Sequence, residues 1–93
     1  MPYYVYILVS ERDGTLYTGQ TNDLTVRLQR HNKGLITSTK RKTPYTLQYF
    51  EVFESRSMAM ARERELKKKW NTERKKKLVR GFDKQRLQDV VVA

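Results

Sequence analysis

The 93-residue sequence contains no cysteine, a single histidine and no long apolar run. The absence of cysteine excludes a disulfide framework, a thiolate nucleophile and thiolate-based zinc or iron–sulfur sites. A single histidine likewise excludes a multi-histidine metal cage. The longest apolar runs span a few residues, such as Val5–Val9, against about 20 for a membrane-spanning helix, and the N-terminus lacks the layout of a signal peptide. We therefore expect a soluble, cytoplasmic protein with no membrane partner.

Negative charge is scarce, with 10 Asp+Glu against 20 Lys+Arg and a formal net charge of +10. Half of the cations lie in residues 62–80, and two looser clusters precede them. A surplus of this size favours a polyanionic partner, and separate clusters suit a surface that follows a phosphate backbone. Charge that serves solubility alone is the competing interpretation. The cations that we predict to bind nucleic acid are Arg30, Lys33, Lys40, Arg41, Lys42, Lys67 and Lys68.

The pattern of apolar and polar residues predicts one small domain of three strands and three helices. Asp13-Gly14 between two β-rich runs indicates a hairpin, and Pro44 ends a polar loop. The fold class is α+β, with a three-stranded, mostly antiparallel sheet flanked by helices in the order ββαβαα. We expect strands at about residues 3–9, 14–19 and 45–53, and helices at about residues 23–33, 55–69 and 71–81.

The C-terminal segment is harder to interpret. Residues 1–82 form the predicted domain, and residues 83–93 form a tail that ends in a run of valines. This run fits either a fourth strand or a disordered segment, and the pattern does not separate the two.

One carboxylate falls on an apolar helix face. At 100° per residue, Ala59, Leu66 and Trp70 form the inward stripe of the predicted helix, and Glu63 lies near its centre. A buried carboxylate is costly without a cation, a metal ion or strong hydrogen-bond donors. Glu63 is therefore either a functional residue or the partner of a nearby arginine, unless the stripe is misphased. Glu65 is a poor second metal ligand because it lies about 160° away around the helix.

The helix predicted at residues 23–33 places an arginine and a histidine on one face. Its apolar stripe includes Leu28 and Leu35, and His31 falls on the same stripe with Arg27 one turn earlier. A lone histidine there is more often a core residue, and an arginine is more often an ion-pair partner. A functional role for both requires that they point toward Glu63.

Tyrosine is abundant, with six copies in the chain. Alternation along the first strand puts Tyr4 and Tyr6 on one face, and Tyr17 precedes Gly19 by two residues in the second strand. Tyrosines in strands are usually packing residues. Phenols from two hairpin strands nevertheless form a polar cluster that so small a sheet does not need for stability, and Gly19 permits close backbone approach.

Taken in order, these residues resemble a known family. The triplets Tyr4-Val5-Tyr6 and Tyr17-Thr18-Gly19, followed by Arg27, His31 and Glu63 on later helices, resemble the GIY-YIG nuclease domain. The resemblance is closer still to the small stand-alone bacterial proteins of the UPF0213 group, and it covers residues 3 to about 80. The segments that carry this closer likeness are Tyr4–Leu8, Leu16–Asp23, Arg62–Lys68 and Trp70.

The resemblance implies a role for each matched residue. Tyr6 and Tyr17 lie in the active centre, and Tyr17 activates the attacking water directly or through a metal ion. Arg27 stabilises the phosphate as charge builds in the transition state, and His31 has a supporting or proton-transfer role. Glu63 is the ligand of a single divalent ion, Mg²⁺ or Mn²⁺.

We therefore predict an endonuclease that hydrolyses DNA phosphodiester bonds with one divalent ion, with RNA kept open as a substrate and a monomer favoured. One inward carboxylate is too few for a two-metal site, whereas Mg²⁺ retains most of its waters. The alternative is a nucleic-acid-binding module with little or no turnover, since these 93 residues include no second domain for targeting. Two departures from the family pattern are the missing glycine of the first triplet and Gln20, where some repair nucleases carry a lysine.

Overall fold

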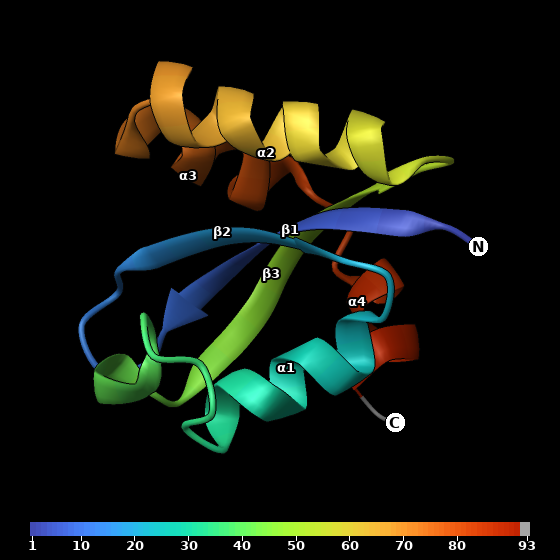
Figure 1. Ribbon diagram of the computed structural model, residues 1–93. Helices are drawn as coiled ribbons and strands as arrows, with labels where there is room; N and C mark the ends of the chain where they lie inside the picture. Colours follow the sequence, from blue (N-terminus) through green and yellow to red (C-terminus); the bar gives the residue numbers. More distant parts are fainter. Residues whose placement is uncertain (92–93) are drawn as a thin grey trace.

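The computed structural model of the chain describes residues 1–91 and has one sheet with helices on both of its faces (Figure 1). It confirms the predicted α+β fold with a three-stranded antiparallel sheet. Within residues 1–91, no helix combines the length and the apolar character needed to cross a membrane. The elements are β1 (Tyr3–Ser10), β2 (Leu16–Thr21), α1 (Leu24–Asn32), the short 3₁₀ helix η1 (Lys40–Lys42), β3 (Tyr45–Phe53), α2 (Arg56–Lys69), α3 (Thr72–Gly81) and α4 (Gln85–Val91).

Strand β1 is the centre of the sheet and runs antiparallel to β2 on one side and β3 on the other. In the turn between β1 and β2, Gly14 adopts a φ of +75°, a left-handed conformation that glycine accommodates without a steric penalty. The hairpin register sets Tyr6 opposite Gly19 and Leu8 opposite Tyr17. Because residues opposite each other share a face, the side chains of Tyr6 and Tyr17 lie on the same side of the hairpin.

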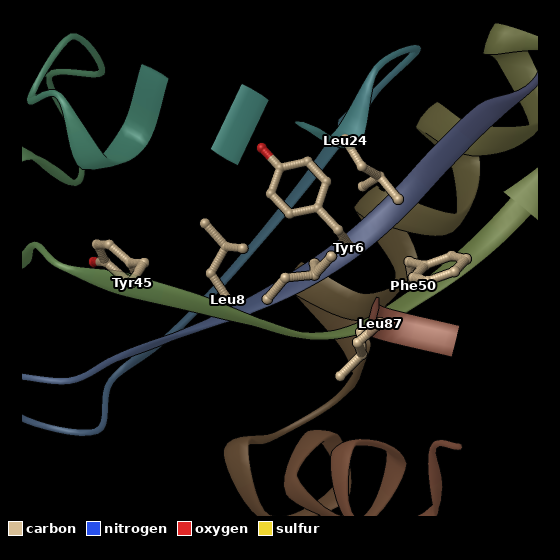
Figure 2. Packing of buried hydrophobic residues seen from close by; sticks show 7 residues of the cluster. Tyr6, Leu8, Leu24, Tyr45, Phe50 and Leu87 are labelled. Atoms are coloured by element: carbon tan, nitrogen blue, oxygen red, sulfur yellow. The ribbon is translucent and has the colours of Figure 1, made fainter. Parts of the chain in front are cut away.

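Different helices cover the two faces of the sheet (Figure 1). On one face, Tyr6 and Leu8 of β1 pack with residues of α1, β3 and α4 in a single apolar cluster (Figure 2). On the other face, Val5 packs against Ala59 and Leu66 of α2, and all three side chains are fully buried. The burial of Ala59 and Leu66 confirms the predicted inward stripe of α2.

Side-chain caps begin the three predicted helices. Asp23, Ser55 and Asn71 each accept a hydrogen bond from the backbone N–H three residues further on, at 3.1, 3.3 and 2.9 Å. The prediction that Leu35 continues the apolar stripe of α1 is wrong. The helix ends at Asn32, Gly34 follows with a φ of +76°, and Leu35 is 61% exposed.

The C-terminal segment is helical where the sequence suggested a strand or disorder. Asp83 accepts a hydrogen bond from the backbone N–H two residues on, at 3.0 Å, and α4 starts there. Leu87 and Val90, three residues apart, pack on the cluster beneath α1, and the Thr25 hydroxyl donates to the Val90 carbonyl at 3.2 Å. These tertiary contacts override the strand propensity of the valines. Residues 92–93, the end of the predicted tail, lie outside the described residues.

Candidate active site

Four of the predicted site residues meet around the Tyr6 phenol. Tyr6 is buried, and its hydroxyl lies 3.0 Å from His31 Nε2 and accepts a hydrogen bond from Arg27 Nε at 3.4 Å. The Tyr17 ring packs against the rings of Tyr6 and His31, with centroid distances of 6.4 and 5.0 Å. The β1–β2 hairpin supplies the two phenols, and α1 supplies the guanidinium and the imidazole.

Gly19 allows this close packing. A Cβ atom at Gly19 would lie 2.6 Å from Tyr6 Cζ, closer still to the Tyr6 hydroxyl, and 3.1 Å from Tyr17 Cε2. Contacts this short do not occur between packed atoms, so a side chain at position 19 would have to displace the Tyr6 phenol. The expected close approach at Gly19 is thus confirmed.

Burial sets the protonation of the cluster. Desolvation raises the pKa of Tyr6 to about 12, although the hydrogen bond from Arg27 acts in the opposite direction. Desolvation, aided by the charge of Arg27, lowers the pKa of His31 to about 4. The hydrogen bond to Tyr6 raises the pKa of the Arg27 guanidinium. At neutral pH the cluster therefore holds a neutral phenol, a neutral imidazole and a permanent positive charge.

Thr39 completes the surroundings of His31, and sequence reasoning did not single it out. His31 is fully buried, and its Nδ1 lies 2.8 Å from Oγ1 of Thr39, which is itself 1% exposed. Thr39 belongs to the polar connection between α1 and β3. No signal in the sequence marks it, because a threonine in such a connection is expected to face solvent.

Glu63 lies on α2 and is connected to the cluster by Lys67, which contacts both Glu63 and Tyr17. Its half-buried carboxylate pairs with Lys67 one turn further along, with 3.2 Å between Oε2 and Nζ. The same ammonium lies 5.6 Å from the centroid of the Tyr17 ring. The charge of Glu63 also contributes to the raised pKa of Tyr6, after burial and Tyr17. The predicted alternative gave Glu63 an arginine partner, whereas the partner in the structure is a lysine.

Arg62 fastens the helix that carries Glu63 to the sheet. Its Nε and Nη2 donate to the two carboxylate oxygens of Glu51 on β3 at 2.9 and 3.0 Å, and its Nη1 donates to Glu65. The guanidinium also lies 5.1 Å from the centroid of the Trp70 ring. Bidentate pairing of this kind fixes orientation as well as distance. Glu65 therefore binds Arg62, and it takes no part in the tyrosine cluster.

The cations predicted to bind nucleic acid are all exposed, and two of them have acidic partners. Lys67 pairs with Glu63, and Lys42 pairs with Asp13 at 3.6 Å. The η1 segment is also tied to the β1–β2 turn, because the Ser10 hydroxyl donates to the Lys42 carbonyl at 2.6 Å. Five have no carboxylate within 4.0 Å among residues 1–91: Arg30, Lys33, Lys40, Arg41 and Lys68.

A groove of about 660 Å³ lies elsewhere, between α1, β3 and α4. Its lining includes Leu28, Tyr45 and Leu47, and none of the five predicted site residues contributes to it. We place the candidate site at the tyrosine cluster because the ionisable groups with shifted pKa values and the close polar contacts meet there.

The candidate site fits a divalent ion held by one carboxylate. In the part of the chain that the structure describes, no three His, Asp or Glu side chains are grouped to hold a metal ion. Mg²⁺ commonly takes one or two protein carboxylates and completes its shell with water and phosphate oxygens. Glu63 offers such a ligand, so it is the residue that would hold the ion.

Tyrosines from a hairpin, set beside an arginine and a histidine from the next helix, are the arrangement that the sequence resemblance predicted for a GIY-YIG domain. The family model for the GIY-YIG catalytic domain matches residues 2–77 of the chain. The chain therefore belongs to the GIY-YIG family.

Curated relatives of the chain carry the name UPF0213. One from Haloquadratum walsbyi is 43% identical over 77 residues, which cover 82% of this chain and 84% of that protein. One from Staphylococcus aureus is 42% identical over 66 residues, covering 70% and 79%. The solution NMR structure of a UPF0213 protein from Bacillus halodurans is 36% identical, has a TM-score of 0.54, and matches 86% of this chain and 84% of that one. The likeness to UPF0213 proteins thus extends over most of the chain.

Proposed function

We propose that this protein is an endonuclease that hydrolyses DNA phosphodiester bonds with a single divalent ion, Mg²⁺ or Mn²⁺. The observation that carries the proposal is a single cluster of four side chains in contact: Tyr6, Tyr17, Arg27 and His31. Glu63 is connected to this cluster through Lys67, which pairs with Glu63 and lies near the Tyr17 ring. Membership of a family whose model describes a catalytic domain supports an enzyme. The net charge of +10 supports a nucleic-acid substrate.

Each residue in the cluster has a chemical role in this proposal. Hydrolysis needs an activated water and stabilisation of the charge that develops on the phosphate and on the leaving oxygen. Arg27 has five N–H donors, so its hydrogen bond to Tyr6 leaves others for phosphate oxygens. Tyr17 is half-buried and less enclosed than Tyr6, which makes it the phenol that contacts the attacking water. His31 is fully buried and acts through Tyr6.

A divalent ion held by Glu63 would supply Lewis-acid stabilisation of the leaving oxygen. The carboxylate is suited to this because it is half-buried on a helix that Arg62 fixes to β3. Because Arg62 ties α2 to β3, the backbone that carries Glu63 is held in place before substrate arrives.

One observation favours a second candidate function. The Glu63 carboxylate is already paired with Lys67, so its charge is compensated within the protein. If this pair persists in the presence of divalent ions, the domain binds nucleic acid through its cations without turnover. The two candidates differ in cleavage but agree on binding.

The test combines cleavage and binding assays. Wild-type protein is incubated with single-stranded, duplex and branched DNA and with RNA, in Mg²⁺, Mn²⁺ or EDTA. We expect metal-dependent cleavage of at least one DNA substrate, and a loss of about 10²-fold or more for Glu63→Gln with DNA affinity retained. Glu73→Gln is the matched control, because Glu73 is an exposed carboxylate of α3. The Glu73→Gln protein should cleave like wild type.

The outcomes separate the candidates. If wild type and Glu63→Gln bind DNA alike and neither cleaves any substrate, the binding module is the correct function. If only RNA is cleaved, the protein is still a metal-dependent nuclease, and the proposal that its substrate is DNA is wrong.

A further inference from the structure

Thr39 is buried in a connection whose other residues are half-buried or exposed. It occupies the N-cap position of η1, yet its side chain makes no capping hydrogen bond to that helix. Its hydroxyl lies instead 2.8 Å from His31 Nδ1, and Thr39 is buried while Ser38 and Lys40 are exposed. The hydroxyl of this loop residue is thus directed at the only histidine in the sequence.

Thr39 belongs to a chain of hydrogen-bonding groups that starts in the candidate site. The Tyr6 hydroxyl lies 3.0 Å from His31 Nε2, His31 Nδ1 lies 2.8 Å from the Thr39 hydroxyl, and that hydroxyl lies 3.4 Å from the Ile36 carbonyl. If His31 is protonated at Nδ1, Tyr6 donates to Nε2, Nδ1 donates to Thr39, and Thr39 donates to Ile36. Every hydrogen in the chain then has an acceptor.

The opposite tautomer leaves a buried donor without an acceptor. His31 Nε2–H would donate to the Tyr6 oxygen, which already accepts a hydrogen bond from Arg27. The Tyr6 hydrogen would then need another acceptor, and among residues 1–91 the Tyr6 hydroxyl has no hydrogen-bond partner except His31 and Arg27. A buried polar group that loses water without gaining a partner is strongly disfavoured.

We propose that Thr39 is a positioning residue that, together with the hydrogen bond from Arg27 to Tyr6, holds His31 in the Nδ1–H tautomer. The protonation of one ring nitrogen is set by the hydrogen bond that the other makes, so an acceptor at Nδ1 leaves Nε2 free to accept. Nε2 then accepts a hydrogen bond from the Tyr6 hydroxyl, which orients the lone pairs of the Tyr6 oxygen toward Arg27. The inference rests on the proposed function, because it treats this cluster as the catalytic centre.

The chain offers a direct spectroscopic test. Because the sequence has one histidine, the imidazole ¹⁵N signals report on His31 alone. In wild type at neutral pH, without metal or substrate, we expect a protonated Nδ1 and an unprotonated Nε2. Thr39→Val keeps the shape of the side chain and removes the acceptor at Nδ1, so each tautomer then leaves one buried donor without an acceptor. We therefore expect the preference for Nδ1–H to be lost and the averaged signals to move toward those of the Nε2–H tautomer. Thr39→Ser keeps the hydroxyl and should retain the wild-type pattern.

Two results would overturn the proposal: an Nε2–H tautomer in wild type, or an unchanged Nδ1–H pattern in Thr39→Val. A backbone amide spectrum shows whether each variant is folded. If Thr39→Val does not fold, the tautomer of wild type and of Thr39→Ser still decides. We also expect Thr39→Val to cleave DNA about tenfold more slowly than Thr39→Ser, because a displaced Tyr6 hydroxyl no longer positions Arg27. An absence of cleavage in wild type would refute the nuclease but leave the tautomer result intact.

Discussion

The ion pair between Glu63 and Lys67 affects the affinity that the candidate site would have for a divalent ion. The two side chains lie one turn apart on α2, with 3.2 Å between their charged atoms. A divalent ion at the same carboxylate would be repelled by an ammonium at that distance. An ion bound at Glu63 would therefore compete with the lysine, and the lysine would have to move away.

Lys67→Gln is expected to tighten Mn²⁺ binding by about two- to fivefold, the range set by the modest worth of a partly exposed ion pair. The affinity is measured by Mn²⁺ titration at low salt, followed by electron paramagnetic resonance and without nucleic acid. Lys68→Gln is the matched control, because it removes the same charge from the next residue of α2. Lys68 has no carboxylate within 4.0 Å among residues 1–91. An equal change in both variants would show that net charge, and not competition at Glu63, governs binding.

At the scale of elements, the β1–β2 hairpin sets the geometry of the cluster. Its register places Gly19 opposite Tyr6, and the missing side chain at position 19 leaves the space that the Tyr6 phenol fills. The phenol has little freedom to move aside, since it is buried and bonded to His31 and Arg27. The register of the hairpin therefore determines the position of the Tyr6 phenol in the site.

Gly19→Ala is therefore expected to lower the free energy of unfolding by about 1–3 kcal/mol, the usual cost of forcing an extra carbon into a packed core. Urea denaturation measures it, and loss of the Tyr6 position should also reduce cleavage. Gly81→Ala is the control, because a Cβ at the end of α3 meets no atom within 4 Å. That variant should stay within about 0.5 kcal/mol of wild type. A Gly19→Ala protein as stable as wild type would contradict the argument.

Local signals explain why most elements were predictable. Three helix starts are set by caps whose side chains accept a hydrogen bond from the backbone N–H three residues further on: Asp23, Ser55 and Asn71. Such contacts between near neighbours can be predicted from the sequence alone. Helix α4 was not predictable, because its valines favour a strand and only contact with the core selects the helix. The role of Thr39 was hidden for a similar reason: its partner His31 belongs to another element, and no periodic pattern links them.

At the scale of the whole molecule, the net charge of +10 is divided among several surfaces. Lys40 and Arg41 lie on η1, Lys68 lies on α2, and five further cations lie on α3 (Figure 1). Hydrogen bonds from the β1–β2 hairpin to backbone carbonyls hold η1 in place, so the backbone that carries its cations has a fixed position relative to the tyrosine cluster. A cation that contacts a phosphate contributes to affinity by releasing a counterion, whereas a cation elsewhere adds only to the general field.

This difference predicts how salt affects DNA binding. Each phosphate contact on duplex DNA contributes about −0.9 to the slope of log affinity against log salt concentration, so Lys40→Gln should make the slope shallower by about that amount. Lys76→Gln removes the same charge from α3, where Lys76 pairs with Glu73 at 3.7 Å, and should leave the slope nearly unchanged. Fluorescence anisotropy in EDTA across a salt series measures both without cleavage. Equal slopes for the two variants would mean that total charge binds the DNA, and that the η1 cluster holds no particular phosphate.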